Sequence, residues 1–207
     1  MTEVERRAAL DAIAAEVRDC TRCRLHETRT KAVPGEGDPS TEVVFVGEGP
    51  GFNEDREGRP FIGRAGDLLV KLLASLGWRR SDVFITNVVK CRPPDNRDPR
   101  PEEITACRPY LEQQLDLIAP KVLVTLGKFA GQLLLDSTVG ITKLRGHDYP
   151  YRGAVLIPTL HPAYALRGGG EPLAQMRADF VRAKRALVAA GSPTIDPTVE
   201  IPSERNA

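Results

Sequence analysis

Short apolar runs alternate along the chain with longer segments in which apolar and polar residues recur at helical spacing. The apolar runs, which are rich in β-branched residues, predict four β-strands, over residues 43–46, 83–89, 122–126 and 154–160. The amphipathic segments predict helices over residues 4–18, 65–76, 101–118, 129–135 and 173–189. The third of these helices begins with proline and two glutamates, which is a typical helix start.

Strands that alternate with helices across short connections are typical of a parallel sheet covered on both faces. We therefore expect an α/β fold, a three-layer α/β/α sandwich around a central, mainly parallel four-stranded sheet. One domain should span residues 1–190, because a chain of 207 residues leaves little room for a second core. The end of the chain, residues 191–207, is polar and contains prolines, which predicts a flexible tail.

The composition is that of an ordinary globular protein, with 41% hydrophobic and 28% charged residues. Residues 1–20 mix charged and apolar side chains, which favours an amphipathic helix over a signal peptide. No apolar run approaches the ~18 residues that a membrane-spanning helix needs. We therefore expect a cytoplasmic protein with no membrane partner. The net charge of +1 does not exclude nucleic acid as a ligand, because a local basic surface can still neutralise phosphates.

The four cysteines of the chain fall in one pattern, a C-x-x-C pair at Cys20 and Cys23 followed by Cys91 and Cys107. In the cytoplasm a cysteine cluster binds metal more often than it forms disulfides. Four thiolates hold either a zinc ion or an iron–sulfur cluster, and the spacing leaves both open. Either group would join the N-terminal helix to the region that follows the second strand.

Polar side chains stand at the carboxyl ends of three predicted strands, where sheets of this kind bind their ligands. Glu48 follows the first strand, Asn87 lies near the end of the second, and His161 follows the fourth. The Asn87 amide complements the N3–H and O4 edge of a pyrimidine, and the alternative is an amide that satisfies backbone groups at the strand end. His26 and His147 are expected on the surface.

Glycines surround two further candidates. The first strand leads into a loop that reads Gly47-Glu48-Gly49-Pro50-Gly51. Such loops often cradle phosphate, but this one lacks the Lys-Ser/Thr of a P-loop and is as well explained by a tight turn. Phe61 lies in a second glycine-containing loop, where a ring suits stacking on a base. The alternative is that Phe61 plugs this loop onto the domain.

Basic residues offer candidate phosphate contacts. Lys143 and Arg145 lie in a loop between the third and fourth strands, on the side where ligands are expected. A second group in the last predicted helix is interpreted as solvated surface charge and comprises Arg177, Arg182, Lys184 and Arg185.

The segments GEGPG, GRPFIGRAG, TNVVKCRPP and HPAY, together with Cys107, resemble the family 4 uracil-DNA glycosylases, the iron–sulfur branch of their superfamily. The resemblance covers roughly residues 14–190. It implies a structural [4Fe–4S] cluster held by Cys20, Cys23, Cys91 and Cys107. The substrate-binding residues that it implies are Gly47, Gly49, Pro50, Gly51, Glu54, Asp55, Phe61, Asn87 and His161. DNA phosphates would contact Lys143, Arg145 and Arg167.

The resemblance also implies an activity, in which uracil is flipped out of single- or double-stranded DNA and its N-glycosidic bond is hydrolysed. A monomeric, monofunctional enzyme would leave an abasic site. Phe61 would stack on uracil, Asn87 would read it, and His161 would stabilise the departing uracilate at O2. Gly49 occupies the place of the water-orienting aspartate of other families, so Glu48 is the nearest carboxylate for this role.

Two alternatives stay open at this point. One is a metal-containing module that binds nucleic acid without cutting it. The other is a glycosylase for another deaminated base such as hypoxanthine. A sliding clamp as protein partner is left undetermined by the sequence.

Overall fold

A computed structural model of the protein describes residues 1–192. The predicted tail lies outside these residues except for its first two positions. The centre of the fold is one six-stranded sheet with the order β1-β3-β2-β4-β6-β5. Its strands are β1 (Glu36–Gly37), β2 (Val43–Gly47), β3 (Phe84–Asn87), β4 (Val122–Leu126), β5 (Tyr149–Tyr151) and β6 (Ala154–Thr159).

The four predicted strands are confirmed as the parallel centre of the sheet, made of β3, β2, β4 and β6. The prediction of four strands in total was wrong, because β1 and β5 add an antiparallel strand at each edge. The β5–β6 hairpin turns at Arg152 and Gly153, both with positive φ, of 47° and 86°. Strands this short have too few residues to show the alternation of apolar and polar positions by which a strand is predicted.

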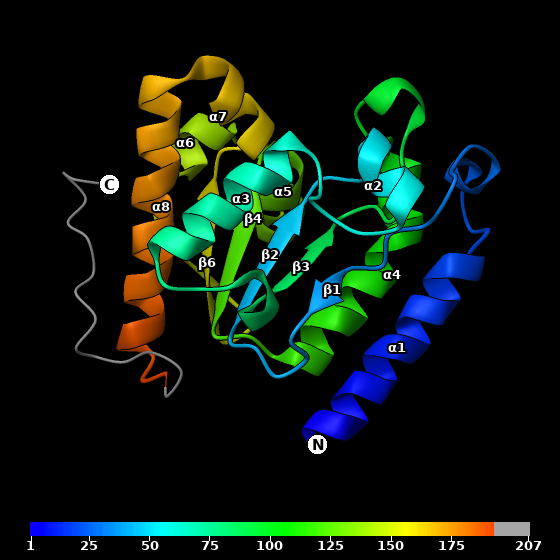
Figure 1. The fold of residues 1–207 in the computed structure, drawn as a ribbon, viewed down its shortest axis with the longest axis horizontal. Helices are drawn as coiled ribbons and strands as arrows, with labels where there is room; N and C mark the ends of the chain where they lie inside the picture. Colours follow the sequence, from blue (N-terminus) through cyan, green and yellow to red (C-terminus); the bar gives the residue numbers. More distant parts are fainter. Residues whose placement is uncertain (193–207) are drawn as a thin grey trace.

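Helices cover both faces of the sheet (Figure 1). They are α1 (Glu3–Asp19), α2 (Phe52–Glu57), α3 (Arg64–Ser75), α4 (Pro101–Ile118), α5 (Lys128–Leu135), α6 (Ile141–Leu144), α7 (Pro162–Gly168) and α8 (Gly170–Ala189), with 3-10 turns η1 (Arg24–Glu27), η2 (Arg80–Asp82) and η3 (Pro94–Asn96). The five predicted helices are confirmed, and α2, α6 and α7 were not predicted. No helix within residues 1–192 is long and apolar enough to cross a membrane.

The alternation of side chains along β2 shows how the three layers are built. Val44 and Val46 pack into an apolar cluster with α1 and α4, whereas Val43 and Phe45 pack into a second cluster with α3 and α8. Figure 1 shows these two pairs of helices on opposite sides of the sheet. The predicted α/β/α sandwich is confirmed, and a strand that is buried on both faces explains the unbroken apolar run in its sequence.

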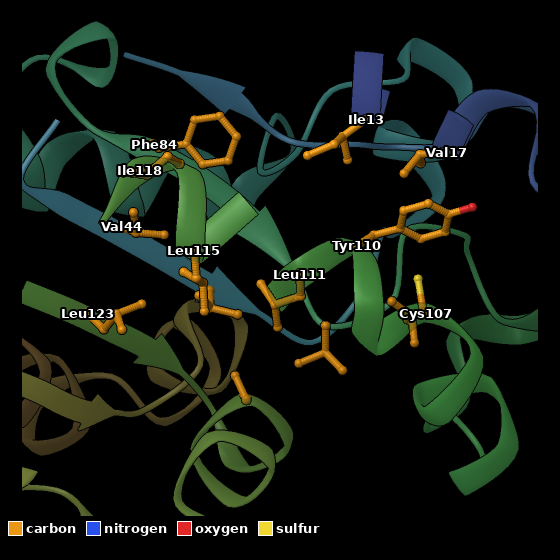
Figure 2. Close-up of a cluster of buried hydrophobic side chains, with 14 of the residues drawn as sticks. Ile13, Val17, Val44, Phe84, Cys107, Tyr110, Leu111, Leu115, Ile118 and Leu123 are labelled. Atoms are coloured by element: carbon orange, nitrogen blue, oxygen red, sulfur yellow. The ribbon is translucent and has the colours of Figure 1, made fainter. Parts of the chain in front are cut away.

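The N-terminal helix is attached to the sheet through α4. Figure 2 shows Ile13 and Val17 of α1 above Tyr110 and Leu111 of α4, in the cluster that also contains Cys107. Val17 is 1% exposed and Tyr110 is 2% exposed. Apolar packing thus places the end of α1, and the cysteine pair that follows it, beside the start of α4.

Lys184 corrects one of the expectations for the last helix. Its side chain is buried, and its Nζ donates a hydrogen bond of 2.7 Å to the backbone oxygen of Leu76. It is therefore not a solvated surface charge. Residue type alone did not show that this position of α8 faces the core.

Candidate active site

A cavity of about 460 Å³ opens at the carboxyl ends of the parallel strands, at the end of the molecule where α2 and α7 lie (Figure 1). The structure brings Glu48, Asn87 and His161 together in its wall, as the strand-end argument predicted. Of the other residues proposed from the sequence, those that line it are Gly49, Pro50, Gly51, Glu54, Phe61 and Arg167.

Four residues proposed from the sequence do not line the cavity, and one of them is Gly47 at the end of β2. Asp55 is buried, and its Oδ1 accepts a hydrogen bond of 2.9 Å from the Thr30 amide, so it anchors α2 to the chain after η1. The Arg145 guanidinium binds both carboxylate oxygens of Asp179, at 3.0 and 2.9 Å. Lys143 is exposed but lies apart from the cavity wall. Asp55 and Arg145 therefore make structural contacts away from the cavity.

The backbone around Phe61 is held from both sides. Phe61 has a φ of 49°, a left-handed conformation that is uncommon outside glycine. Arg80 Nη1 donates to the Phe61 carbonyl oxygen at 2.9 Å. Glu54 Oε1 accepts the amides of Ile62 and Gly63 at 2.9 and 3.0 Å. These bonds stabilise the loop and fix where the ring stands.

The Phe61 ring reaches its place because Gly47 has no side chain. A Cβ atom at Gly47 would lie 2.7 Å from Cε2 of Phe61 and would also overlap Oδ1 of Asn87. The ring is 6% exposed, packs with the second apolar cluster and lines the cavity. Its centroid lies 5.9 Å from that of the His161 ring. Phe61 thus anchors its loop to the domain and also lines the cavity, and its stacking on a base stays a prediction.

Asn87 carries an unpaired polar atom. The residue is 1% exposed, and its Oδ1 is buried without a hydrogen-bond partner in the part of the chain that the structure describes. Buried polar atoms nearly always have a partner, so an orphan in a cavity wall points to a ligand. The alternative, in which Oδ1 satisfies a backbone group at the strand end, does not describe this geometry.

His161 is held as a neutral donor. It caps α7, and its Nδ1 accepts a hydrogen bond of 3.2 Å from the Ala163 amide. Burial, together with the nearby charge of Arg167, lowers the pKa of His161 to about 4. A neutral ring whose Nδ1 accepts carries its proton on Nε2. The ring can therefore donate one hydrogen bond from Nε2 at physiological pH.

Glu48 has the opposite kind of shift. Burial and the charge of Asp98 raise the pKa of Glu48 to about 7, against a smaller opposing effect of Lys128. The backbone oxygen of Glu48 accepts the Val89 amide at 3.0 Å, which continues the β2–β3 pairing past the ends of the strands. A carboxyl group with a pKa near the working pH suits a general base.

The sequence analysis missed the contribution of the loop between β3 and α4. Asn96, Arg97 and Asp98 line the cavity. The loop is fixed by Arg97, whose guanidinium donates to both carboxylate oxygens of Glu103 at 2.6 and 2.9 Å. The sequence of this loop shows no periodicity that would predict its position. The one available signal for a turn was the pair Asp95-Asn96, because these residue types tolerate positive φ, and their φ values here are 56° and 51°.

All four cysteines line a second pocket, next to the first cluster of apolar residues. They are free thiols. The free space within this pocket is small, about 10 Å³. Burial raises the pKa of Cys107 to about 11 and raises the pKa of Cys91 as well. No group of three or more His, Cys, Asp or Glu side chains within residues 1–192 stands ready to hold a single metal ion.

Hydrogen-bond donors point at the sulfur atoms of this pocket. Arg29 Nη1 lies 3.1 Å from Sγ of Cys91, and the Lys90 amide lies 3.2 Å from Sγ of Cys107. Donors of this kind favour thiolates, which are the form of cysteine that binds metals.

Comparison with known proteins agrees with the fold. The family model of the uracil DNA glycosylase superfamily matches residues 34–187. A type-4 uracil-DNA glycosylase of Sulfurisphaera tokodaii is 51% identical over 76% of this chain and 76% of its own length. One of Thermotoga maritima is 45% identical over 88% of this chain and 96% of its own length. A type-5 uracil-DNA glycosylase of Thermus thermophilus is 35% identical over 62% of this chain and 63% of its own length.

The chain therefore belongs to the uracil DNA glycosylase superfamily and, within it, to the type-4 family.

Proposed function

We propose that this protein removes uracil from DNA by hydrolysing the N-glycosidic bond, which leaves an abasic site. The observation that carries the proposal is the buried, unpaired amide oxygen of Asn87 in the wall of the strand-end cavity. Family membership supports it, since the relatives are named uracil-DNA glycosylases. The monomeric state expected from the sequence is part of this proposal.

Recognition begins when the base leaves the DNA stack, which costs about a few kcal/mol. Stacking on the Phe61 ring offsets about 1–3 kcal/mol of this cost. The Asn87 oxygen then accepts N3–H of uracil while the amide nitrogen donates to O4. Cytosine presents an acceptor at N3 and an amine at C4, so it meets the same amide with both bonds reversed.

Cleavage places positive charge on the sugar and negative charge on the departing uracil. His161 donates from Nε2 to uracil O2 and so stabilises the charge that develops in the transition state. The bond from the Ala163 amide to Nδ1 holds the ring in this tautomer. A neutral ring donates this hydrogen bond and keeps its own proton.

Glu48 is the group that orients the attacking water and accepts its proton. Its carboxylate also opposes the positive charge on the sugar. Burial, together with the charge of Asp98, which the sequence analysis missed, keeps the pKa of Glu48 in the range where a base works at neutral pH.

The four cysteines are proposed to hold a [4Fe–4S] cluster. Four thiolates can hold either a zinc ion or an iron–sulfur cluster, and the resemblance to the iron–sulfur branch of the superfamily favours the cluster. The cluster supplies a structural link between α1, the segment after β3 and the start of α4, and no step of base removal requires its electrons. Its positive charge would also allow buried thiols to become thiolates.

The DNA strand is proposed to cross the mouth of the cavity beside α2. Phe52 is 54% exposed, and the guanidinium groups of Arg92 and Arg56 lie 5.2 and 5.8 Å from its ring centroid. Arg92 also donates to Oδ1 of Asn96, in the cavity wall, at 2.7 Å. An aromatic ring flanked by cations suits an unpaired base and its phosphates. Arg167 is a further candidate phosphate contact at this mouth.

One experiment separates the proposal from its alternatives. The protein is incubated with single-stranded and duplex oligonucleotides that carry uracil, hypoxanthine or a thymine mismatch, and alkali then cleaves any abasic site. We expect cleavage at uracil. Cleavage at hypoxanthine alone would show a different substrate, and binding without cleavage would show a module that is not an enzyme.

A further inference from the structure

Lys90 is a buried cation that the reaction described above does not use. Its side chain is 1% exposed. Its Nζ donates to three oxygens, Oγ1 of Thr86 at 2.5 Å, the backbone oxygen of Asn87 at 2.8 Å and Oε1 of Gln114 at 2.7 Å. All three acceptors are neutral, and no ion pair with a carboxylate is found for Lys90 within residues 1–192. Burying an ammonium group among neutral acceptors is costly, so a useful effect should accompany it.

One of these acceptors belongs to the residue that would read the base. β3 ends at Asn87, and the next two amides, of Val88 and Val89, still bond to the backbone oxygens of Gly47 and Glu48 at 2.9 and 3.0 Å. The carbonyl of Asn87 instead accepts from Lys90. The peptide group that follows the base-reading side chain is therefore fixed by this ammonium group.

The other acceptors tie Lys90 to the rest of the sheet. Gln114 is 2% exposed, accepts from Lys90 and donates from Nε2 to the backbone oxygen of Pro34 at 2.8 Å. Thr86 Oγ1 donates to that same oxygen at 3.1 Å. Lys90 is thus held by α4 and by the chain before β1, so its Nζ has a defined position from which to hold Asn87.

We propose that Lys90 is a positioning residue, whose ammonium group holds the Asn87 carbonyl and so keeps the Asn87 amide in the orientation that reads uracil. This inference rests on the proposed function, because it assigns Lys90 a place in the recognition of that base. The amide of Lys90 also donates to Sγ of Cys107. Lys90 thus bonds to one residue from the wall of each site, Asn87 of the cavity and Cys107 of the cysteine pocket.

A second buried lysine provides a matched control. Lys184 is 3% exposed, and its Nζ also donates to a backbone oxygen, that of Leu76, at 2.7 Å. It lies in α8, in the layer on the other side of the sheet from α4, and it does not line the cavity. A purely structural role for Lys90 predicts that the two lysines respond alike to the same substitution.

The experiment compares Lys90→Met with Lys184→Met. Methionine keeps the unbranched shape of the side chain, one atom shorter, and removes the charge and all three donors. We expect both variants to melt at a lower temperature, and only Lys90→Met to lose single-turnover uracil release, by about a hundredfold, as small displacements of site groups do. Lys184→Met should stay within about twofold of the wild type. Visible absorbance and iron content, measured on both, show whether any cluster is retained.

Two readouts distinguish positioning from a loss of fold. Free uracil, used as an inhibitor, should bind Lys90→Met about tenfold more weakly, as the loss of one hydrogen bond predicts. In a double-mutant cycle, Asn87→Ala with Lys90→Met should be no slower than Asn87→Ala alone, within about twofold. If Lys90→Met does not fold, Lys90→Gln replaces it. It keeps one donor, and we expect a loss of about tenfold.

The outcomes separate the two proposals. A wild-type protein that releases no uracil overturns the proposed function, and this inference with it. A wild type that releases uracil, with Lys90→Met at the wild-type rate, overturns this inference alone. Rates that multiply in the double variant would also overturn it, because Lys90 would then act independently of Asn87.

Discussion

The strand-end cavity and the cysteine pocket lie on either side of residues 87–91, and they differ in what their side chains leave unpaired. In the cavity, Asn87 has a buried oxygen without a partner within residues 1–192, and His161 and Glu48 have pKa values shifted by burial. The cysteine pocket is lined by thiols, by apolar side chains such as Val17 and by charged residues such as Arg29, whose guanidinium bonds to Cys91 Sγ. Residues 87–91 therefore separate a cavity whose polar groups can bind a substrate from a pocket whose thiols a metal would stabilise.

This difference indicates how the work is divided. Buried polar groups of the kind found in the cavity lower the stability of the fold slightly and become useful when the substrate arrives. Thiols that join distant segments contribute to stability once a metal binds them. Substitutions in the cavity should thus reduce the rate, whereas substitutions in the cysteine pocket should reduce the stability. The predictions below test this division, beginning with the largest effect.

His161→Ala removes the donor that faces the leaving group, and we expect the single-turnover rate to fall by about a thousandfold. The melting temperature should change by no more than about 4 °C, the equivalent of ~1 kcal/mol in a protein of this size. Rapid-quench measurement on an oligonucleotide with one uracil, together with calorimetry, checks both values. A fully active His161→Ala variant would remove this histidine from the reaction.

Cys107→Ser tests the other pocket. Loss of one of four ligands should reduce the iron content and lower the free energy of unfolding by about 3 kcal/mol, or roughly 10 °C in melting temperature. Iron analysis and calorimetry measure the two effects, and His161→Ala serves as the control that keeps its iron. If Cys107→Ser retains both iron and stability, the four cysteines do not act as one site.

Glu48→Gln tests the pKa that burial and Asp98 raise to about 7. The carboxylate form, which accepts a proton, increases as the pH rises through this value, so the wild-type rate should climb between about pH 6 and 8. His161, with a pKa of about 4, stays neutral over this range and adds no second limb. The glutamine variant should be about a hundredfold slower at the upper pH and nearly independent of pH.

The raised pKa of Glu48 also makes the stability of the folded protein depend on pH. The pKa of Glu48 is higher in the folded protein than in the unfolded chain, where it is near the ordinary value of 4.5. The folded state therefore binds more protons between these two values, and stability falls as the pH rises through them. Glu48→Gln should remove this decline. If the stability of the Glu48→Gln variant falls by the same amount over this pH range, another titrating group is responsible for the fall.

Phe52→Ala should have the smallest effect. Removing the exposed ring beside the cavity mouth should weaken binding to DNA with an abasic site by about tenfold, with little change in the single-turnover rate. Val4→Ala is a suitable control because Val4 is exposed but lies at the start of α1, away from the cavity. Equal affinity of both variants would place the DNA strand elsewhere.

The parts of the fold that the sequence predicted are those with long, regular patterns. The helix over residues 101–118 was predicted with the bounds that α4 has, because its proline start and apolar spacing agree. The edge strands were missed because β1 has two residues and β5 has three, with no buried position in either. Neither length gives a period that could be recognised.

The site shows a similar limit. Topology alone placed Glu48, Asn87 and His161 at one end of the sheet. It could not separate two neighbouring acids, of which Glu54 lines the cavity and Asp55 turns away to Thr30. That choice depends on the short helix α2, whose six residues between glycines carry no predictive pattern. Charge partners such as Asp98, brought in by an irregular loop, were also beyond a sequence-based prediction.

The central claim is that the cavity beside Asn87 reads and releases uracil. The most direct test compares the wild type with Asn87→Ala on two oligonucleotides that differ only in carrying uracil or cytosine at one position, with the free base measured by chromatography. We expect the wild type to release uracil and no cytosine, and Asn87→Ala to release uracil at least about a hundredfold more slowly with unchanged iron content. Uracil release by Asn87→Ala at the wild-type rate would contradict the claim.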